Sequence, residues 1–223
     1  VKTLRRMVQR QATLEDVEGL YTKQAGMNER TGESKTKQQY STPSPLAWLM
    51  NKFLGMNAER AGFTSYDPTG GNGMLQHGAD LSRATVNELD AGARLKALQD
   101  LIGAQGGAVL NADALVRSDN PPDKSQDRVI ANPPFGKAPM MKVGALNYEL
   151  TKLEHQIMAI ALEKLKDNGK SAFIIGGHNF RQEIRDEKGK VVSSVDKMSR
   201  ADAQFLSYIY NTFSVTHNLE ING

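Results

Sequence analysis

The tetrapeptide Asn132-Pro133-Pro134-Phe135 combines residue types that suit chemistry on a planar amino group. The two prolines fix φ and carry no N–H, so this stretch presents carbonyl acceptors with few competing backbone donors. Asn132 adds a neutral side-chain acceptor, and Phe135 adds a flat apolar face. Two acceptors beside a stacking surface favour a ring that bears an exocyclic NH₂ group.

The chain directly before the tetrapeptide predicts where this group of residues lies. The apolar run 128–131 reads as a buried strand that ends at Asn132. In open α/β sheets, ligands bind at the carboxyl edge of the strands. Asn-Pro-Pro also occurs in ordinary turns, so the tetrapeptide alone leaves a turn and a catalytic motif both open.

A glycine-rich turn follows an earlier predicted strand at 63–67. Residues 67–73 read Asp-Pro-Thr-Gly-Gly-Asn-Gly, and glycines allow close approach of the backbone to a ligand and positive φ. The spacing departs from G-x-G-x-x-G and lacks the Gly-Lys-Ser/Thr ending of a P-loop. A ligand-binding turn and a simple tight turn remain alternatives at this point.

Carboxylates follow the next two predicted strands. Glu88 ends the strand at 84–88, where a carboxylate can accept hydrogen bonds from both hydroxyls of a ribose. The alternative, a solvated acid that starts a helix, suits Asp90 better. Asp113 follows the short strand at 108–110, and a helix cap is the alternative for it.

Taken in order, these motifs resemble those of S-adenosylmethionine-dependent amino-methyltransferases, above all the adenine-N6 DNA methyltransferases related to type I modification subunits. Asn132-Pro133-Pro134-Phe135 resembles their catalytic motif, and residues 67–73 resemble their Asp-Pro-x-x-Gly-x-Gly turn. Residues 87–90 and 111–115 resemble the two motifs between them. Gln-Tyr-Ser-Thr-Pro at 39–43 resembles the N-terminal cofactor motif, an aromatic residue followed by Thr-Pro.

The resemblance implies a site and a reaction. The catalytic set is Asn132, Pro133, Pro134 and Phe135, and the set that binds S-adenosylmethionine is Tyr40, Thr42, Asp67, Thr69, Gly70, Gly71, Gly73, Glu88, Leu89, Asp113, Ala114 and Asn132. Tyr40 and Thr42 close over the methionine moiety, and Asp67 faces its ammonium. The implied reaction is methylation of adenine N6 in DNA, with S-adenosylhomocysteine as product.

Three readings of the activity stay open beside one another. The same fold and cofactor serve other planar amino groups, namely guanine N2 in RNA or a glutamine side chain of a protein. A non-catalytic module that binds cofactor or nucleic acid within a larger assembly is a third reading. A narrower likeness is to the methyltransferase portion of large phage or mobile-element proteins, which implies a bacterial or phage source.

The elements expected around these motifs define a fold class. Further helices are expected in the first 20 residues, from Ser44-Pro45 onward, and at 91–101, 153–166 and 201–212, with strands at 171–175 and 215–221. Alternating strands and helices predict an α/β, Rossmann-like class I methyltransferase fold: a mostly parallel sheet with helices on both faces. The fold is expected to be truncated after its sixth strand.

The expected organisation is a helical and linker segment at 1–38 and a catalytic domain at 39–223. DNA is the expected partner. Because no target-recognition region is visible, a target-recognition subunit or further domains of a longer chain are also expected. Residues 137–147 read as a loop, either a flap over substrate or a plain surface loop. The charged stretch 181–200 reads as a solvated hairpin, with a phosphate-contacting insertion as the alternative.

Composition excludes several classes of function. The 223-residue chain has no cysteine, which excludes disulfides, thiolate metal sites and cysteine nucleophiles. Its four histidines lack metal-ligand spacing, so we expect structural or surface roles and no metal; His178 is the one plausible pocket neighbour. The net charge of +3 is compatible with nucleic acid. No apolar run reaches the length of a bilayer span, so a cytoplasmic protein without a membrane partner is expected.

Overall fold

The structure is a computed structural model that describes residues 1–9, 11–23, 41–56, 62–177 and 179–219. The chain forms two compact units: a larger one, Val1–Pro134 with Ile157–Ile174, and a smaller one, Phe135–Gln156 with Ile175–Gly223. The predicted boundary at residue 38 does not coincide with this division, because Leu4 and Val17 belong to the core of the larger unit. The expected linker at 26–38 lies outside the described residues.

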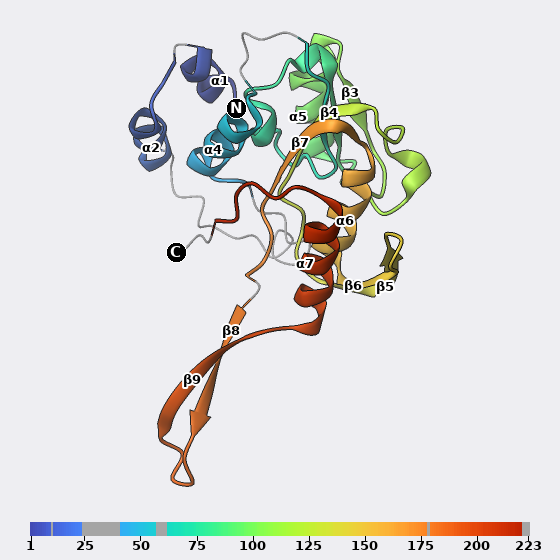
Figure 1. Cartoon of the computed structure of the whole chain (residues 1–223). Coiled ribbons are helices and arrows are strands. Elements are labelled where there is room, and N and C mark those ends of the chain that lie inside the picture. The colour runs from blue at the N-terminus through green and yellow to red at the C-terminus, as the bar shows by residue number, and fades with distance from the viewer. Residues whose placement is uncertain (10, 24–40, 57–61, 178, 220–223) are drawn as a thin grey trace. The chain divides into compact units, whose positions relative to one another are not determined.

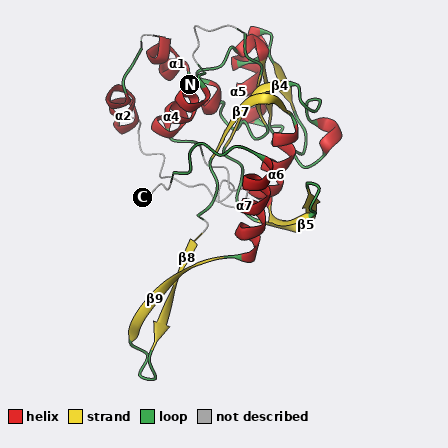
Figure 2. Cartoon of the chain, viewed as in Figure 1, coloured by secondary structure: helices red, strands yellow, loops and turns green. Residues whose placement is uncertain are grey.

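Figure 1 shows the order of the elements along the chain, and Figure 2 shows which of them are helices and strands. The helices are α1 (Lys2–Gln9), α2 (Leu14–Thr22), α4 (Ser44–Leu54), α5 (Ala93–Leu101), α6 (Leu153–Glu163) and α7 (Arg200–Thr212). The strands are β1 (Ser65–Asp67), β2 (Ala84–Asn87), β3 (Ala108–Leu110), β4 (Gln126–Ala131), β5 (Lys137–Val143), β6 (Tyr148–Lys152), β7 (Leu165–Phe173), β8 (Asn179–Arg185) and β9 (Val191–Met198). Short 3₁₀ turns follow the glycine-rich turn and flank the early strands.

The larger unit is built on one five-stranded sheet in the order β3-β2-β1-β4-β7. Every neighbouring pair in it is parallel. This order is that of the first five strands of a Rossmann fold. The prediction of an α/β, Rossmann-like fold with a mostly parallel sheet is therefore confirmed.

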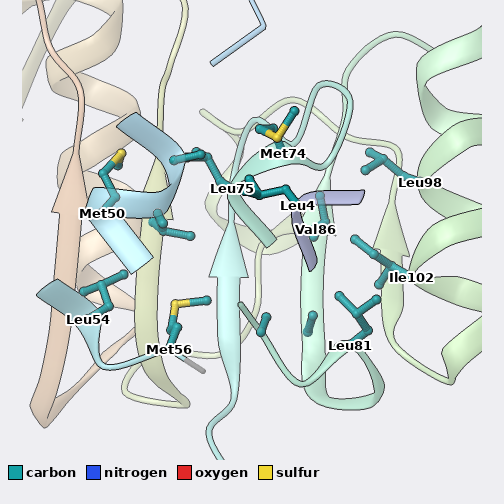
Figure 3. Packing of buried hydrophobic residues seen from close by; sticks show 14 of the residues in the cluster. Leu4, Met50, Leu54, Met56, Met74, Leu75, Leu81, Val86, Leu98 and Ile102 are labelled. Atoms are coloured by element: carbon teal, nitrogen blue, oxygen red, sulfur yellow. The ribbon is translucent and has the colours of Figure 1, made fainter. Parts of the chain in front are cut away.

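Both faces of the central strands are covered, as a parallel sheet requires. Successive side chains of a strand point to opposite faces, and all three residues of β1 are buried. On one face Val86 and Ile130 pack in a cluster with Leu54 of α4 and Leu98 of α5; Figure 3 shows Leu54 and Leu98 on either side of Val86. On the other face Tyr66 and Val129 pack against Ala161 of α6.

The helix expected over the first 20 residues is two helices, α1 and α2. Gln11 adopts a positive φ of 57° between them, and Thr13 then starts α2. The Thr13 hydroxyl accepts from the Asp16 N–H while the Asp16 carboxylate accepts from the Thr13 N–H, which is a capping box. α1 is tied to the rest of the unit by Arg5, whose guanidinium donates to the carbonyls of His77 and Ala79.

The start of α4 differs by one residue from the prediction. Ser44 was expected to be the N-cap, but Pro43 occupies that position with no side-chain cap, and Ser44 is the first helical residue. Proline at Pro45 is still within the first turn, where its missing N–H costs nothing. The helix ends at Gly55, whose φ of 63° is the left-handed conformation common after helices.

Two predictions at the end of the larger unit are wrong. The helix expected to run to 166 ends at Glu163, and the Glu163 and Lys164 carbonyls accept from the backbone N–H groups of residues 124–126 instead of continuing the helix. Asn168-Gly169, expected to terminate that helix, lies inside β7 at an irregularity in its pairing with β4. In the smaller unit, the last strand expected at 215–221 is also absent over its described part, 215–219.

The smaller unit contains two antiparallel hairpins and α7. Residues 137–147, expected to be a loop, instead form β5 and the turn to β6, with Gly144 and Asn147 in positive φ at that turn. The hairpin expected within 181–200 is confirmed as β8 and β9. Helix α7 begins at a Ser199 cap, whose hydroxyl accepts from the Asp202 N–H. Figure 2 shows β8 and β9 as a two-stranded ribbon.

In the described part of the chain, no helix has the length and apolar character that crossing a membrane requires.

Candidate functional site

Four of the predicted site residues follow neighbouring strands at the carboxyl edge of the sheet. Across the sheet they occur in the order Asp113, Glu88, Asp67, Asn132, because the strands they follow are ordered β3-β2-β1-β4. The chain leaves β1 toward β2 on one side and reaches β4 on the other, so β1 and β4 flank the switch point of the topology. Ligands of such sheets bind in the crevice at this point.

Asp67 ends β1 with an incompletely satisfied carboxyl group. It is fully buried, and its Oδ1 accepts a hydrogen bond of 3.0 Å from the Thr69 N–H. Its Oδ2 has no hydrogen-bond partner among the described residues. Burial raises the pKa of Asp67 to about 7; the Thr69 bond opposes this rise, and the nearby Glu88 charge adds to it. A cationic ligand group at Oδ2 would satisfy this carboxylate.

The glycine-rich turn is held by the end of β2. Gly71, with φ of 56°, donates its N–H to Glu88 Oε2 at 2.9 Å. Glu88 Oε1 accepts from the Asp90 N–H at 2.9 Å, and the side chain is buried. The alternative of a solvated acid is therefore wrong for Glu88. Asp90 fits it better, since its carboxylate accepts from the Gly92 N–H at the exposed start of α5.

Two of the site glycines are required by packing within the larger unit. A Cβ on Gly70 would lie 2.1 Å from Val86 Cγ1 and 3.3 Å from the Asn87 carbonyl oxygen. A Cβ on Gly73, whose φ is 76°, would lie 2.8 Å from Leu101 Cδ2 of α5. These glycines let the turn lie directly on the β2 strand and the α5 helix.

We expect Gly70→Ala to destabilise the protein by about 2–4 kcal/mol, because β2 must move or Val86 must leave its rotamer. Gly19→Ala is the matched control, since a Cβ at Gly19 in α2 meets nothing within 4 Å. It should stabilise by up to about 1 kcal/mol, the cost of glycine in a helix. Urea unfolding of both variants measures the difference, and equal stabilities would contradict this account of the turn.

Asn87 is a site residue that the sequence analysis missed. It is buried at the end of β2, and its Nδ2 donates to the carbonyls of Pro68 and Ala112 at 3.1 and 2.9 Å. Its Oδ1 accepts from the Ala112 N–H at 3.0 Å. One side chain thus ties together the chain segments that leave β1 and β3. An asparagine as the last residue of a short strand, directly before Glu88, was the available signal.

Residues after β3, the outer strand on one side of the sheet, form the last part of the carboxyl edge on that side. Asp113 is exposed, and its Oδ1 accepts from the Leu115 N–H at 2.9 Å in a turn. No α-helix starts there in the described chain, so the helix-cap alternative does not apply. Ala114 is buried, whereas Leu89 exposes 69% of its surface beside Glu88.

Asn132, directly after β4, is joined to a residue far away in sequence. Its Nδ2 donates to Thr42 Oγ1 at 3.2 Å across a separation of 90 residues. Thr42 is buried, and the preceding Ser41 accepts through Oγ from Asn72 Nδ2 of the glycine-rich turn at 3.1 Å. The structure therefore brings Thr42 to the predicted catalytic motif as well as near the predicted cofactor turn.

Two predicted site residues are not tested by this geometry. Tyr40 lies outside the described residues. Phe135 is the first residue of the smaller unit, so its stacking role stays a prediction. Within that unit the chain after Phe135 is fixed, because the Gly136 N–H donates to the buried Glu154 carboxylate at 3.0 Å and the Gly136 carbonyl accepts from the Leu153 N–H at 2.8 Å.

The histidines stand mostly as expected. His77, which follows the glycine-rich turn in the chain, is buried, and burial lowers its pKa to about 4. His155 is buried in the smaller unit and stacks on Phe205 with ring centroids 4.0 Å apart. His217 is exposed, and His178, the expected pocket neighbour, lies outside the described residues. Among the side chains that the structure describes, no cluster suits a metal ion.

Comparison with known proteins gives no match to a protein family or to a curated protein. Solved structures with a similar fold include a Pyrococcus horikoshii protein described as an RNA methyltransferase, 22% identical with a TM-score of 0.39, covering 55% of this chain and 60% of that one. A Listeria monocytogenes protein described as a class I S-adenosylmethionine-dependent methyltransferase is 17% identical, with a TM-score of 0.47 and coverages of 74% and 56%. DrdV in complex with DNA is 12% identical, with a TM-score of 0.42 and coverages of 72% and 22%.

The chain thus spans at most 60% of the length of each of these three proteins. Their identities and TM-scores are too low to carry an argument about family or activity. The assignment of the fold rests on the strand order and direction of the sheet itself.

Proposed function

We propose that this chain transfers the methyl group of S-adenosylmethionine to the N6 amino group of adenine in DNA. The observation that carries the proposal is the pairing of two groups on neighbouring strands at the switch point. One is the buried Asp67 carboxyl, whose Oδ2 lacks a partner among the described residues. The other is the Asn132 amide at the end of β4.

The described residues fit the cofactor. Asp67 Oδ2 and Thr69 Oγ1 are buried polar atoms with no partner in the described chain, and they would receive the ammonium end. Each Glu88 oxygen accepts one backbone N–H and keeps a further lone pair for a ribose hydroxyl. The exposed Leu89 side chain would contact the adenine ring of the cofactor, and the Asp113 carboxylate would accept a hydrogen bond from the amino group of that ring. The bound cofactor would supply an electrophilic methyl group on a sulfonium.

The protein's contribution to the reaction is positioning and acceptor groups. The amino nitrogen of adenine is a poor nucleophile, because its lone pair is delocalised into the ring. Asn132 Oδ1 and the Pro133 carbonyl would accept hydrogen bonds from this NH₂ and favour a more tetrahedral nitrogen, with its lone pair directed at the methyl carbon. The methylated nitrogen is strongly acidic, so water can take the proton. No strong base is needed, and Phe135 is proposed to stack on the base.

The order of the motifs along the chain supports adenine in DNA as the acceptor over the alternatives. The aromatic-x-Thr-Pro segment precedes the glycine-rich turn in sequence, an order that resembles type I adenine enzymes. Thr42 of that segment also bonds Asn132, which links the segment to the acceptor amide. A duplex adenine would have to leave the base stack to reach Asn132, which costs a few kcal/mol.

The test is incubation of the protein with methyl-labelled S-adenosylmethionine and unmethylated DNA, RNA or protein, followed by digestion and mass spectrometry. N6-methyl-2′-deoxyadenosine in the DNA digest is the expected result. Label in N2-methylguanosine of RNA, or in methylglutamine, would move the proposal to the alternative acceptors. Cofactor binding without transfer to any of them would favour the non-catalytic module.

A further inference from the structure

The Asn132 amide has two possible orientations, and only one of them suits the proposed reaction. With Nδ2 turned toward Thr42, its other end presents an oxygen that can accept from an amino group. Rotated by half a turn, the amide would present an NH₂ donor to an amino group that also donates. The orientation of this side chain therefore decides whether the Asn132 amide attracts or repels the amino group of the acceptor.

Thr42 is the only described residue whose side chain bonds this amide. The Nδ2-to-Oγ1 distance is 3.2 Å, and no further partner of the Asn132 side chain occurs among the described residues. Thr42 is 5% exposed, so water competes poorly for the bond. The contact lies wholly within the larger unit, between the chain before α4 and the end of β4.

Both partners of this contact are held by restricted backbones. Thr42 precedes Pro43 and Asn132 precedes Pro133, and a residue before proline is confined to extended conformations. Thr42 is also β-branched, which limits the rotation of its hydroxyl-bearing carbon. The Ser41–Asn72 bond at 3.1 Å anchors the same segment to the glycine-rich turn. These features make the hydroxyl a fixed partner that holds the plane of the amide. Because a hydroxyl can accept or donate, it pairs with Nδ2 when an amino group that donates binds the amide oxygen.

We propose that Thr42 is a positioning residue that holds the plane of the Asn132 amide, with its hydroxyl accepting from Nδ2 while the amide oxygen accepts from the acceptor amine. This proposal rests on the proposed function and changes the role expected for Thr42, from contact with the methionine moiety to orientation of the catalytic amide. The Ser41-Thr42 segment then joins the cofactor turn to the catalytic motif.

The test compares Thr42→Val, which keeps the shape and removes the hydroxyl, with Thr42→Ser, which keeps the hydroxyl. We expect Thr42→Val to lower kcat by about tenfold, the effect of losing one hydrogen bond that orients the reacting group, with the Kd for S-adenosylmethionine changed less than about threefold. Thr42→Ser should recover most of kcat. Thr22→Val is the matched control, because the Thr22 hydroxyl donates to the Gly19 carbonyl at the exposed end of α2 and has no other partner among the described residues.

A second readout is independent of turnover. In ¹⁵N-labelled protein, the side-chain amide signal of Asn132, identified by its loss in Asn132→Ala, should shift and exchange with water faster in Thr42→Val but not in Thr42→Ser. If Thr42→Val does not fold, as judged by its melting curve, Thr42→Ala takes its place in both measurements.

The outcomes separate the two levels of the proposal. A weaker Kd for S-adenosylmethionine with unchanged kcat would overturn the role of Thr42, as would an unchanged amide signal. Absence of transfer by the unmodified protein would instead refute the proposed function, while the amide signal still decides whether Thr42 orients Asn132.

Discussion

Asn132→Ala is expected to lower methyl transfer by about 1000-fold or more, while leaving affinity for S-adenosylmethionine largely intact. The amide oxygen is proposed to bond the amino group of the acceptor, and loss of such a bond in an active site costs about 100- to 1000-fold in rate. The substitution also removes the hydrogen bond between Asn132 and Thr42, and this loss adds to the effect. Transfer is measured by incorporation of labelled methyl into DNA, and affinity by isothermal titration calorimetry.

Asn168→Ala serves as the matched control for this prediction. Asn168 is an exposed asparagine in β7, away from the carboxyl edge of the sheet. It should retain normal transfer and affinity. Turnover close to normal in Asn132→Ala would contradict the assignment of the catalytic motif. Loss of cofactor binding in that variant would place Asn132 in the cofactor site instead.

Cofactor affinity is expected to depend on pH through Asp67. Its pKa is raised to about 7 by burial, so below pH 7 the carboxyl is mostly protonated and cannot pair with an ammonium. The Kd for S-adenosylmethionine should fall about tenfold per pH unit as pH rises toward 7, and one proton should be released per cofactor bound. Above about pH 8 the ammonium of the cofactor itself loses its proton, so affinity should decline again.

Asp67→Asn should abolish the rise in affinity below pH 7 and weaken binding by about 10- to 100-fold at pH 7.5, the effect of losing a charge-assisted hydrogen bond. Titration calorimetry in buffers of different ionisation enthalpy measures both the Kd and the released proton. A pH-independent Kd in the unmodified protein would contradict the role of Asp67.

The same pKa predicts a stability effect of opposite sign in the cofactor-free protein. The unfolded chain releases the Asp67 proton near its ordinary value of 3.8, and the folded protein releases it only near 7. Between these values unfolding releases a proton, so the contribution of Asp67 to the free energy of unfolding falls as pH rises. Bound cofactor should remove this loss, because it would satisfy the charged carboxylate.

Several elements followed directly from local sequence. The β3 strand at Ala108–Leu110 has the predicted bounds, and α7 differs from its prediction by one residue. These segments are bounded by residues that settle the local conformation, such as the Ser199 cap of α7. Predictions failed where a long-range contact overrode the local pattern. Helix α6 ends at Glu163, where the Glu163 and Lys164 carbonyls pair with backbone N–H groups of residues 124–126, and Asn168-Gly169 lies inside β7.

The sequence by itself determined which residue types follow each strand: an acid after β1, β2 and β3, and an amide with two prolines after β4. The spacing of apolar residues and the positions of turn residues are local properties of the chain. The order of these motifs and the parallel sheet could therefore be predicted from them. Only the tertiary structure decided that Asp67 Oδ2 is buried without a described partner, that Asn87 ties three strand ends, and that Thr42 bonds Asn132. Each of these depends on contacts between residues distant in sequence, and burial and side-chain pairing arise only when the strands assemble.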